Sequence, residues 1–392
     1  MSLSYTYPGV YVEEKDTGAR PIQGVSTTTA AFVGTAPKAD ARPMTAVAVN
    51  SFGEFTSMFG SESPSPNILA NAVYGFFING GSRCYVVNLG GEGRPIDPAL
   101  AAIEAIDEIA MIAAPGRADI AATARLLSFC ENLGDRFAIL DAPGPDRVDL
   151  DALVRVGQEL DPAAKPGKDD PEAGLRAPAS PRGFGAQYFP WLRVRDALDP
   201  TKLVTVPPSG HVAGIYARTD TQRGVFKAPA NEVVRGATGL TQPLTNAEQG
   251  KLNKRGVNAI RFFSTQGILV WGARTLAPED SNWTYVSVRR LVLFIEQSIY
   301  RSTGWVVFEP NDRPLWKAIR RDVSAFLMML WRSGALAGAR AEDAFFVKCD
   351  EETNPEDKIN LGIVTTVIGI APVKPAEFVI FEIGQMAGQA AA

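Results

Sequence analysis

TYVSVRRLVLFIEQSIYRS, residues 284–302, opens the part of the chain that decides the fold. Its apolar residues recur at the i, i+4, i+7, i+11 spacing of one helical face, and they are Val288, Val292, Ile295 and Ile299. This spacing predicts a long amphipathic helix. Residues 283–384 as a whole predict two such helices, a short acidic break and two β segments near the C-terminus.

A second helix is predicted over residues 315–332, after the turn EPNDRP at residues 309–314. Asn311 or Asp312 can cap its start, and Pro314 suits its first turn. The apolar face is formed by Leu315, Ile319, Val323, Phe326, Leu327, Leu330 and Trp331, and the opposite face by Lys317, Arg320, Arg321 and Ser324.

Two β segments follow, LGIVTTVIGI at residues 361–370 and EFVIFEI at residues 377–383. Their β-branched and aromatic content is typical of strands. The N-terminal arm, residues 1–16, also has β character, although Pro8 and Gly9 interrupt it. A strand this close to a terminus needs a partner sheet. That sheet can belong to the local domain or to another subunit, and both interpretations stay open at this point.

The middle of the chain alternates between predicted strands and helices. A helix over residues 67–77 and a strand over residues 83–89 are followed by a glycine-rich hinge at residues 90–93. The alternation is typical of a parallel sheet covered by helices. The later predicted elements are strands over residues 109–114, 136–140, 187–194, 259–263 and 268–274 and helices over residues 118–133, 149–160, 208–219 and 246–255.

Composition places the chain among ordinary globular proteins. Of its 392 residues, 46% are hydrophobic and 21% charged, and the net charge of −4 gives no sign of nucleic-acid binding. No apolar run reaches membrane-spanning length and the N-terminus lacks a signal-peptide layout, so we expect a protein that stays in the cytoplasm after synthesis. Cys84, Cys130 and Cys349 are odd in number and far apart, which predicts reduced, buried thiols.

The sequence offers little catalytic chemistry. It has one histidine, His211, and no phosphate-binding loop, Rossmann glycine motif or nucleophile elbow. Asp141 followed by His211 has the chain order of a subtilisin-type triad, with Ser264 or Ser281 as candidate nucleophiles. Neither serine sits in the small-residue turn that such a nucleophile needs. We therefore expect no catalytic residue, no cofactor and no metal site.

Motifs at both ends of the chain resemble one family, the contractile phage tail sheath proteins. The N-terminal motifs are YPGVYVEE at residues 7–14, RPIQGV at 20–25 and TTAAFVG at 28–34. The C-terminal motifs are RRLVLFIE at residues 289–296, WVVFEPN at 305–311 and PVKPAEF at 372–378. They occur in the order and spacing of the family, which makes the resemblance specific.

The resemblance implies an α/β fold with an inner α+β domain. That domain would be built from residues 20–89 and 283–376, with residues 90–282 inserted as a subtilisin-like α/β domain without protease activity. Residues 1–19 would form an N-terminal arm with an intersubunit strand. Residues 377–392 would form a C-terminal intersubunit strand and tail.

The resemblance also implies a structural protomer rather than an enzyme. Hexameric rings would stack around an inner tube and contract to drive the tube through a target envelope. The implied partners are further copies of the chain, the inner tube protein, and baseplate and terminator proteins, with no nucleic acid and no membrane insertion. Assembly would take place in the bacterial cytoplasm, and the mature protein would belong to a phage tail or a contractile injection particle. A subtilisin-like hydrolase and a non-contractile tail protein are the alternatives.

Three groups of site residues follow from the resemblance. Terminal strands exchanged between subunits would pair by β-augmentation, with residues 16–18 and 371–376 as flexible links. The strand residues are Tyr5, Tyr7, Val10, Tyr11 and Val12 in the N-terminal arm, and Phe378, Val379, Ile380, Phe381 and Ile383 in the C-terminal segment. The helix over residues 315–332 would face the tube through Lys317, Arg320 and Arg321, although a solvated helix face is the alternative interpretation.

Overall fold

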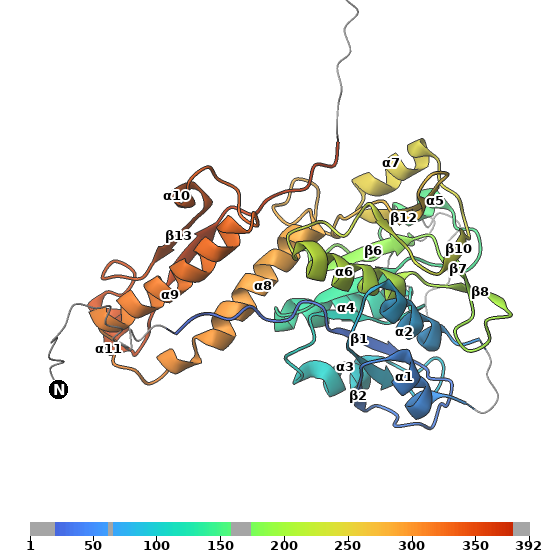
Figure 1. Ribbon diagram of the computed structural model, residues 1–392, viewed down its shortest axis with the longest axis horizontal. Helices are drawn as coiled ribbons and strands as arrows, with labels where there is room; N and C mark the ends of the chain where they lie inside the picture. Colours follow the sequence, from blue (N-terminus) through green and yellow to red (C-terminus); the bar gives the residue numbers. More distant parts are fainter. Residues whose placement is uncertain (1–19, 62–65, 158–173, 379–392) are drawn as a thin grey trace, which may run out of the picture. The chain divides into compact units, whose positions relative to one another are not determined.

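The computed structural model describes residues 20–61, 66–157 and 174–378. The chain divides into two compact units, a larger unit of residues 24–297 and 372–392 and a smaller unit of residues 1–23 and 298–371. Helix α8 (Val286–Ser302), predicted from its apolar spacing, begins in the larger unit and ends in the smaller one. Figure 1 shows the course of the chain.

The larger unit is built on a mixed sheet. Its strands are β1 (Ala30–Gly34), β2 (Ala46–Val49), β3 (Cys84–Asn88), β4 (Met111–Ala113), β5 (Phe137–Asp141), β6 (Gly185–Phe189), β9 (Glu232–Val233), β11 (Val257–Phe263) and β12 (Gly267–Val270). Within the described residues they form a nine-stranded sheet in the order β2-β3-β1-β4-β5-β6-β11-β12-β9. Neighbours from β3 to β11 run parallel, and β2, β12 and β9 are antiparallel to their neighbours.

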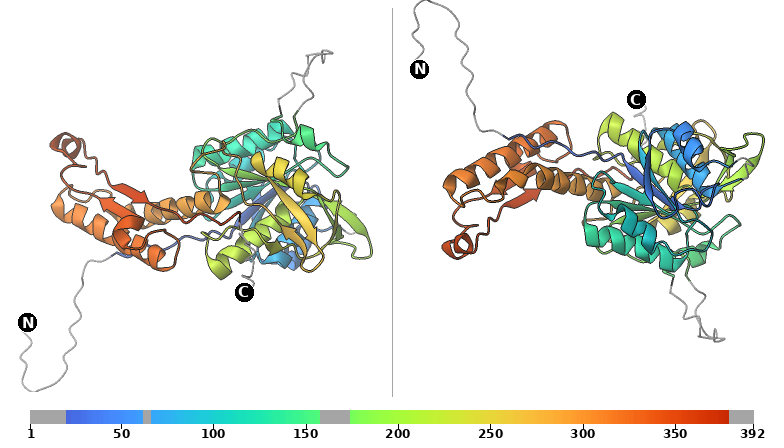
Figure 2. Two further views of the ribbon diagram at one scale, coloured as in Figure 1. Left: turned by 90° about the horizontal axis from the view of Figure 1, so that it is seen from above. Right: turned by 90° about the horizontal axis from the view of Figure 1, so that it is seen from below.

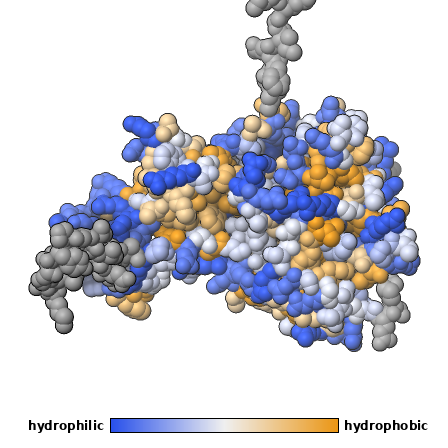
Figure 3. Space-filling view, in the orientation of Figure 1, coloured by the Kyte–Doolittle hydropathy of each residue, from blue (hydrophilic) through white to orange (hydrophobic). Residues whose placement is uncertain are grey.

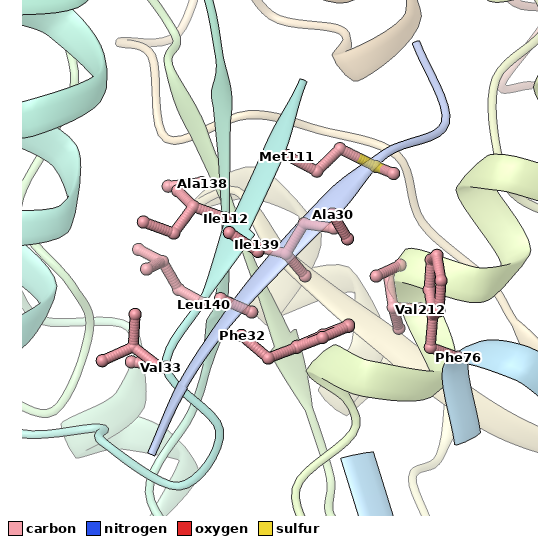
Figure 4. Close-up of a cluster of buried hydrophobic side chains, with 14 of the residues drawn as sticks. Ala30, Phe32, Val33, Phe76, Met111, Ile112, Ala138, Ile139, Leu140 and Val212 are labelled. Atoms are coloured by element: carbon pink, nitrogen blue, oxygen red, sulfur yellow. The ribbon is translucent and has the colours of Figure 1, made fainter. Parts of the chain in front are cut away.

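Helices cover both faces of this sheet. Figure 2 shows α1 (Phe52–Phe59), α2 (Ile68–Asn79) and α6 (Ser209–Arg223) on one face, and α3 (Asp97–Glu104) and α4 (Ile120–Leu133) on the other. Successive residues of a strand point to opposite faces. Phe32 of β1 accordingly points toward Phe76 of α2 and Val212 of α6, whereas Val33 points the other way (Figure 4). The Phe32 and Phe76 rings meet edge to face at 5.4 Å.

Glycines let α2 and α6 approach each other closely. A Cβ atom at Gly214 of α6 would lie 2.4 Å from the carbonyl oxygen of Phe76, and one at Gly210 would lie 2.4 Å from the carbonyl oxygen of Ala72. Real Cβ contacts are not this short, so the two helices touch backbone to backbone. This contact holds α6 over the centre of the sheet.

The remaining elements of the larger unit flank the sheet. A small antiparallel sheet has the strand order β10-β7-β8. The sequence predicts one strand over residues 187–194, but Pro190, which cannot donate a ladder hydrogen bond, separates β6 from β7. The further elements are β7 (Leu192–Arg195), β8 (Leu203–Val206), β10 (Ala237–Leu240), α5 (Leu150–Leu153) and α7 (Asn246–Lys254).

Two adjacent arginines fix the first turns of α8 within the larger unit. The Arg290 guanidinium donates to Asp220 at 2.7 Å and to the carbonyl oxygen of Thr27 at 2.9 Å. The side chains of Arg290 and Asp220 are 4% and 3% exposed, so this ion pair is buried. Arg289 stacks on the ring of Phe184 at 4.5 Å.

The smaller unit contains the second predicted helix. Asp312 caps α9 (Arg313–Arg332) by accepting a hydrogen bond from the Leu315 amide at 3.0 Å, as predicted. The predicted strand over residues 361–370 is shorter than expected, because residues 361–362 form a turn, with Gly362 at a φ of 71°, and only residues 367–370 pair. The other elements are η1 (Gly304–Val306), α10 (Ala341–Ala344), α11 (Glu356–Asn360), β13 (Phe345–Lys348) and β14 (Val367–Ile370).

The structure corrects the predicted division into domains. The sequence predicts that residues 20–89 join residues 283–376 in an inner domain and that residues 90–282 form an insert. Ala30 of β1 instead pairs with Cys84 on one side and with Met111 on the other. The hinge at residues 90–93 therefore lies in a connection within one sheet. The subtilisin-like character of the predicted insert stays a prediction.

Gly214→Ala is expected to lower the free energy of unfolding by about 1–3 kcal/mol, because its methyl group would enter the backbone of α2. Gly250→Ala is the matched control: Gly250 lies inside α7 with nothing within 4 Å of its would-be Cβ. It should gain roughly 0.5–1 kcal/mol from helix propensity. Urea unfolding of both variants measures the difference, and equal stabilities would contradict the close contact of α2 and α6.

Candidate assembly surfaces

The smaller unit carries a sheet of two strands. β13 and β14 run antiparallel, with Phe345 opposite Ile370 and Lys348 opposite Val367. Figure 1 shows β13 alongside α9. In the described part of the chain no third strand pairs with either of them, so each strand has an outer edge without a ladder partner. Unpaired edges of this kind are templates for a further strand.

Apolar side chains are exposed on this sheet. Phe346 is 55% exposed and Val367 is 43% exposed. The Phe346 ring covers Gly369 on the opposite strand, where a Cβ atom would collide with it. In Figure 3, apolar surface gathers over α9 and β13 next to strongly hydrophilic surface. The sheet therefore offers both unpaired edges and apolar contact area to an added strand.

The predicted terminal strands lie almost wholly outside the described residues. Of the ten strand residues named at the two termini, only Phe378 is described, and its side chain is 73% exposed. At the N-terminal side the described chain starts at Arg20. The guanidinium of Arg20 lies 4.5 Å from the centre of the Trp305 ring. The residues outside the described ranges are Tyr5, Tyr7, Val10, Tyr11, Val12, Val379, Ile380, Phe381 and Ile383.

The three basic residues predicted to face the tube lie on α9 but differ in their surroundings. Lys317 and Arg321 are exposed, and Arg320 is half-buried. Arg321 donates from Nε to the buried Asp322 at 2.8 Å, so its charge is partly committed within its own unit. Among the described residues, no salt bridge holds Lys317 or Arg320.

The carboxylate of Asp141 fills a position where α/β proteins often bind ligands. Asp141 ends β5, at the carboxyl edge of the parallel strands, and α6 begins nearby. Its oxygens accept hydrogen bonds from the Ser209 amide at 2.8 Å, the Ser209 hydroxyl at 2.7 Å and the Gly116 amide at 3.0 Å. The amino end of α6 is thus already occupied by an anion from its own chain.

The candidate triad is not assembled in the described part of the chain. His211 is buried against Gly75 of α2, and its Nδ1 has no hydrogen-bond partner there. The hydrogen bonds of Asp141 go to Ser209 and Gly116 instead. Ser264 is exposed in the turn after β11, and Ser281 accepts a hydrogen bond from the Trp283 amide.

Cysteines and acidic side chains are dispersed over the described part of the chain. The free cysteines Cys84, Cys130 and Cys349 are buried, as predicted. Burial raises the pKa of the Cys84 and Cys130 thiols. Within the described ranges, no group of three or more histidine, cysteine, aspartate or glutamate side chains is placed to hold a metal ion. The described helices include none with the length and apolar character needed to cross a membrane.

Comparison with known proteins identifies the family. Residues 188–276 match the phage tail sheath protein central domain, and residues 278–385 match the phage tail sheath C-terminal domain. The fold matches a chain of the contracted sheath complex of an extracellular contractile injection system, PVC, with a TM-score of 0.78 and 31% identity over 98% of this chain and 99% of the other. The chain therefore belongs to the contractile tail sheath family, as the motifs at both ends predict.

Further relatives extend the comparison. The contracted helical sheath of the anti-feeding prophage gives a TM-score of 0.75 and 31% identity over 97% of this chain and 100% of the other. The tail sheath protein of Vibrio phage KVP40 is 27% identical over 44% of this chain and 26% of its own length. The tail sheath protein of Burkholderia phage BcepMu is 27% identical over 44% of this chain and 37% of its own length. The match therefore spans less than half of each of these two phage proteins.

Two buried groups give opposite pH dependences to stability. Burial lowers the pKa of His211 from 6.5 to about 4, so the unfolded chain takes up a proton first and stability falls as the pH drops from 6.5 toward 4. Burial raises the pKa of Asp141 to about 6, despite hydrogen bonds from Ser209 and Gly116. The protonated Asp141 therefore contributes to the free energy of unfolding below the pKa that Asp141 has in the unfolded chain, and this contribution is lost as the pH rises through 6.

His211→Leu is expected to remove the fall in stability that His211 causes as the pH drops from 6.5 toward 4. Between pH 7 and pH 5 the variant should gain about 2 kcal/mol of unfolding free energy relative to the parent, because it has no imidazole to protonate. Asp141→Asn, which removes the opposing contribution, should lose stability more steeply than the parent over the same range. Urea unfolding at both pH values measures this. A pH-independent difference between His211→Leu and the parent would show that His211 does not titrate as a buried neutral group.

Proposed function

We propose that this chain is the protomer of a contractile tail sheath. Hexameric rings of the protein stack around an inner tube and contract to drive the tube through a target envelope. The proposal is supported by family membership and by the match, over nearly the whole chain, to sheath proteins in contracted assemblies. A solved baseplate of the anti-feeding prophage contains a chain of similar fold, which supports a baseplate contact for this protein too.

One observation carries the proposal most directly: among the described residues, the sheet of β13 and β14 has two outer edges without a paired strand, and its apolar side chains are exposed. A sheet of two strands is at best marginally stable alone in water, and adding strands satisfies its outer backbone groups. A polymer can meet this need by strand addition between subunits, in which main-chain hydrogen bonds supply the link and side-chain alternation fixes the register.

The terminal segments of the chain are the proposed added strands. The N-terminal segment around Tyr7 and Tyr11 and the C-terminal segment from Phe378 onward have the aromatic and β-branched residues that suit pairing. Each would leave its own subunit and complete the sheet of another. Residues 16–18 would act as a flexible link, so that subunits move as rigid bodies while staying connected. On the C-terminal side, the predicted link over residues 371–376 ends at Glu377, which is bound to Arg274 of its own subunit, so the donated part would start after it.

Contraction in this proposal needs no bound nucleotide. The extended sheath would be metastable, and the energy of contraction would come from interfaces that grow as the rings move. Assembly would take place in the bacterial cytoplasm around the tube, with baseplate and terminator proteins at the two ends. The mature location would be a phage tail or a contractile injection particle.

The contact with the tube is assigned to α9. Lys317 is exposed and Arg320 half-buried, and no salt bridge within the described chain competes for either charge. Acidic residues of the tube are the proposed partners. Exposed ion pairs contribute roughly 0–1 kcal/mol each. A weak contact suits a tube that must slide free during contraction.

Deletion of residues 1–14 is expected to leave the fold intact and to abolish polymerisation. If the arm pairs only with another subunit, its removal leaves the contacts within a single subunit unchanged, and the melting temperature of the isolated subunit should stay that of the full chain. Electron microscopy of the full-length protein should show hollow helical tubes, and the deletion variant should show none. Tubes formed by the deletion variant would contradict strand donation by the N-terminal arm.

A peptide of residues 1–14 provides a direct second test of the same contact. Added to the deletion variant, it should slow hydrogen exchange at the backbone amides of β13 or β14, because a new ladder would form there. A scrambled peptide of the same composition is the control. Equal exchange rates with both peptides would place the arm elsewhere.

Charge reversal on α9 tests the tube contact. Lys317→Glu with Arg320→Glu should reduce co-assembly with the tube protein by about tenfold at low salt, since two attractive pairs become repulsive. Lys251→Glu, an exposed charge reversal on α7, is the matched control. Pull-down of sheath with tube at low and high salt measures both. Unchanged recovery of the double variant would remove α9 as the docking helix.

A further inference from the structure

A carboxylate-binding site lies on the larger unit, close to the C-terminal end of the described chain. Its occupant is Glu377. Asn253, near the end of α7, donates from Nδ2 to Oε1 at 2.6 Å. Arg274 donates from Nε to Oε1 at 2.9 Å and from Nη2 to Oε2 at 2.7 Å. The Tyr285 hydroxyl donates to Oε2 at 3.1 Å. Both carboxylate oxygens are therefore held by side chains from separate segments of the chain.

The binding residues are fixed by the larger unit itself. The backbone of Arg274 is held by the buried side chain of Asn258 in β11, which accepts from the Arg274 amide at 2.7 Å and donates to its carbonyl oxygen at 2.7 Å. Arg274 also forms an antiparallel β-bridge with Tyr285. Its Nη1 donates to the carbonyl oxygen of Asn253 at 3.3 Å. The site is thus positioned by contacts that do not involve Glu377.

Partial burial makes this contact stronger than a surface ion pair. The side chains of Arg274 and Glu377 are 16% and 20% exposed, whereas those of the Arg313–Glu351 pair are 71% and 67% exposed. Burial alone would raise the pKa of Glu377, but hydrogen bonds from Arg274 and Asn253 hold it below its usual value. Glu377 is therefore charged at neutral pH, and charge-assisted bidentate bonds of this type are among the strongest in proteins.

The site lies where the proposed donated strand begins. Phe378 follows Glu377 directly and is 73% exposed. We propose that Asn253, Arg274 and Tyr285 form an anchor that fixes the point at which the C-terminal strand leaves its own subunit. The anchor passes tension from the donated strand to the larger unit. This inference rests on the proposed function, because it assigns a role to a strand that another subunit receives.

The anchor limits the distance between linked subunits. With Glu377 held, the free part of the C-terminal segment starts at residue 378. With Glu377 released, residues 372–376 would add roughly 17 Å of reach at the extended length of a chain. A sheath without the anchor would therefore lose the fixed spacing that a regular helical lattice needs. Because tension would no longer reach the larger unit at residue 377, neighbouring subunits would also be coupled more loosely.

A spin label at residue 378 tests the anchor in the isolated protein. Phe378→Cys can be labelled selectively because the native cysteines are buried. In the parent background the spectrum should show a restricted label, and adding Glu377→Gln should make it mobile. Glu351→Gln, which neutralises the exposed carboxylate of the Arg313 pair, is the matched control and should change nothing. An equally restricted label in the Glu377→Gln variant overturns the proposal, once thermal melting has shown that both variants fold.

A charge exchange separates the anchor from a general effect of the substitution. Arg274→Glu alone should release the label, and combining it with Glu377→Arg should restore restriction in part, since opposite charges face each other again. Release that persists in the double variant, with a parent-like melting temperature, would count against a direct pair. Tyr285→Phe, which removes one weaker hydrogen bond, should give an intermediate spectrum, and a spectrum as mobile as that of Glu377→Gln would contradict the leading role of Arg274.

Assembly experiments distinguish this inference from the proposed function. Glu377→Gln should lower the yield of regular tubes by about tenfold, the effect of weakening one charge-assisted contact. Deletion of residues 378–392 should abolish tubes, and if it does not, strand donation by the C-terminal segment fails. A second outcome separates the two proposals. The deletion abolishes tubes, but the Glu377→Gln variant, although its label is mobile, forms tubes with the yield and axial repeat of the parent. In that case the proposed function stands and the anchor proposal is overturned.

Discussion

The buried ion pair of Arg290 and Asp220 is the constraint on which the rest of the structure depends. It joins α8, α6 and the segment before β1, because Arg290 also binds the carbonyl oxygen of Thr27, and the Thr27 hydroxyl donates to Asp220 at 2.6 Å. Loss of either partner would leave an uncompensated charge in the interior, at a cost of about 3–5 kcal/mol. Two of the three places where the chain passes between the larger and the smaller unit, within α8 and before β1, thus follow directly from this buried pair.

Local patterns in the sequence were sufficient for the long helices. The apolar spacing of residues 284–302 predicts α8, and Asp312 and Pro314 mark the start of α9 as the structure has it. The burial of Arg289 and Arg290 was not predictable in this way. Neighbouring residues on a helix point in different directions. Arg289 also contacts Trp283 and Glu296 nearby, but the partners Phe184 and Asp220 lie far away in the sequence, so no local pattern indicates these two contacts.

Partners far away in the sequence also explain why the predicted domain boundary and the Glu377-binding site were not found from local patterns. A glycine-rich segment at residues 90–93 looks like a boundary, but only strand pairing shows that β1 lies between β3 and β4. The motif over residues 372–378 contains Glu377, and nothing within it indicates Asn253, Arg274 or Tyr285 as partners. Strand β13 was also missed, because four residues carry too weak a pattern until β14 pairs with them.

During contraction, a sheath needs some contacts that stay formed and others that break. The sheet of β13 and β14 suits contacts of the first kind, and α9 suits contacts of the second kind. Main-chain ladders on β13 and β14 would require several hydrogen bonds to break together, so a donated strand is a persistent link. The side chains on α9 are exposed, and exposed pairs are weak and sensitive to salt. The Glu377 anchor belongs with the persistent links, because it is half-buried and bidentate. On the proposed function, force therefore runs between subunits through the anchored strand, while the tube contact yields.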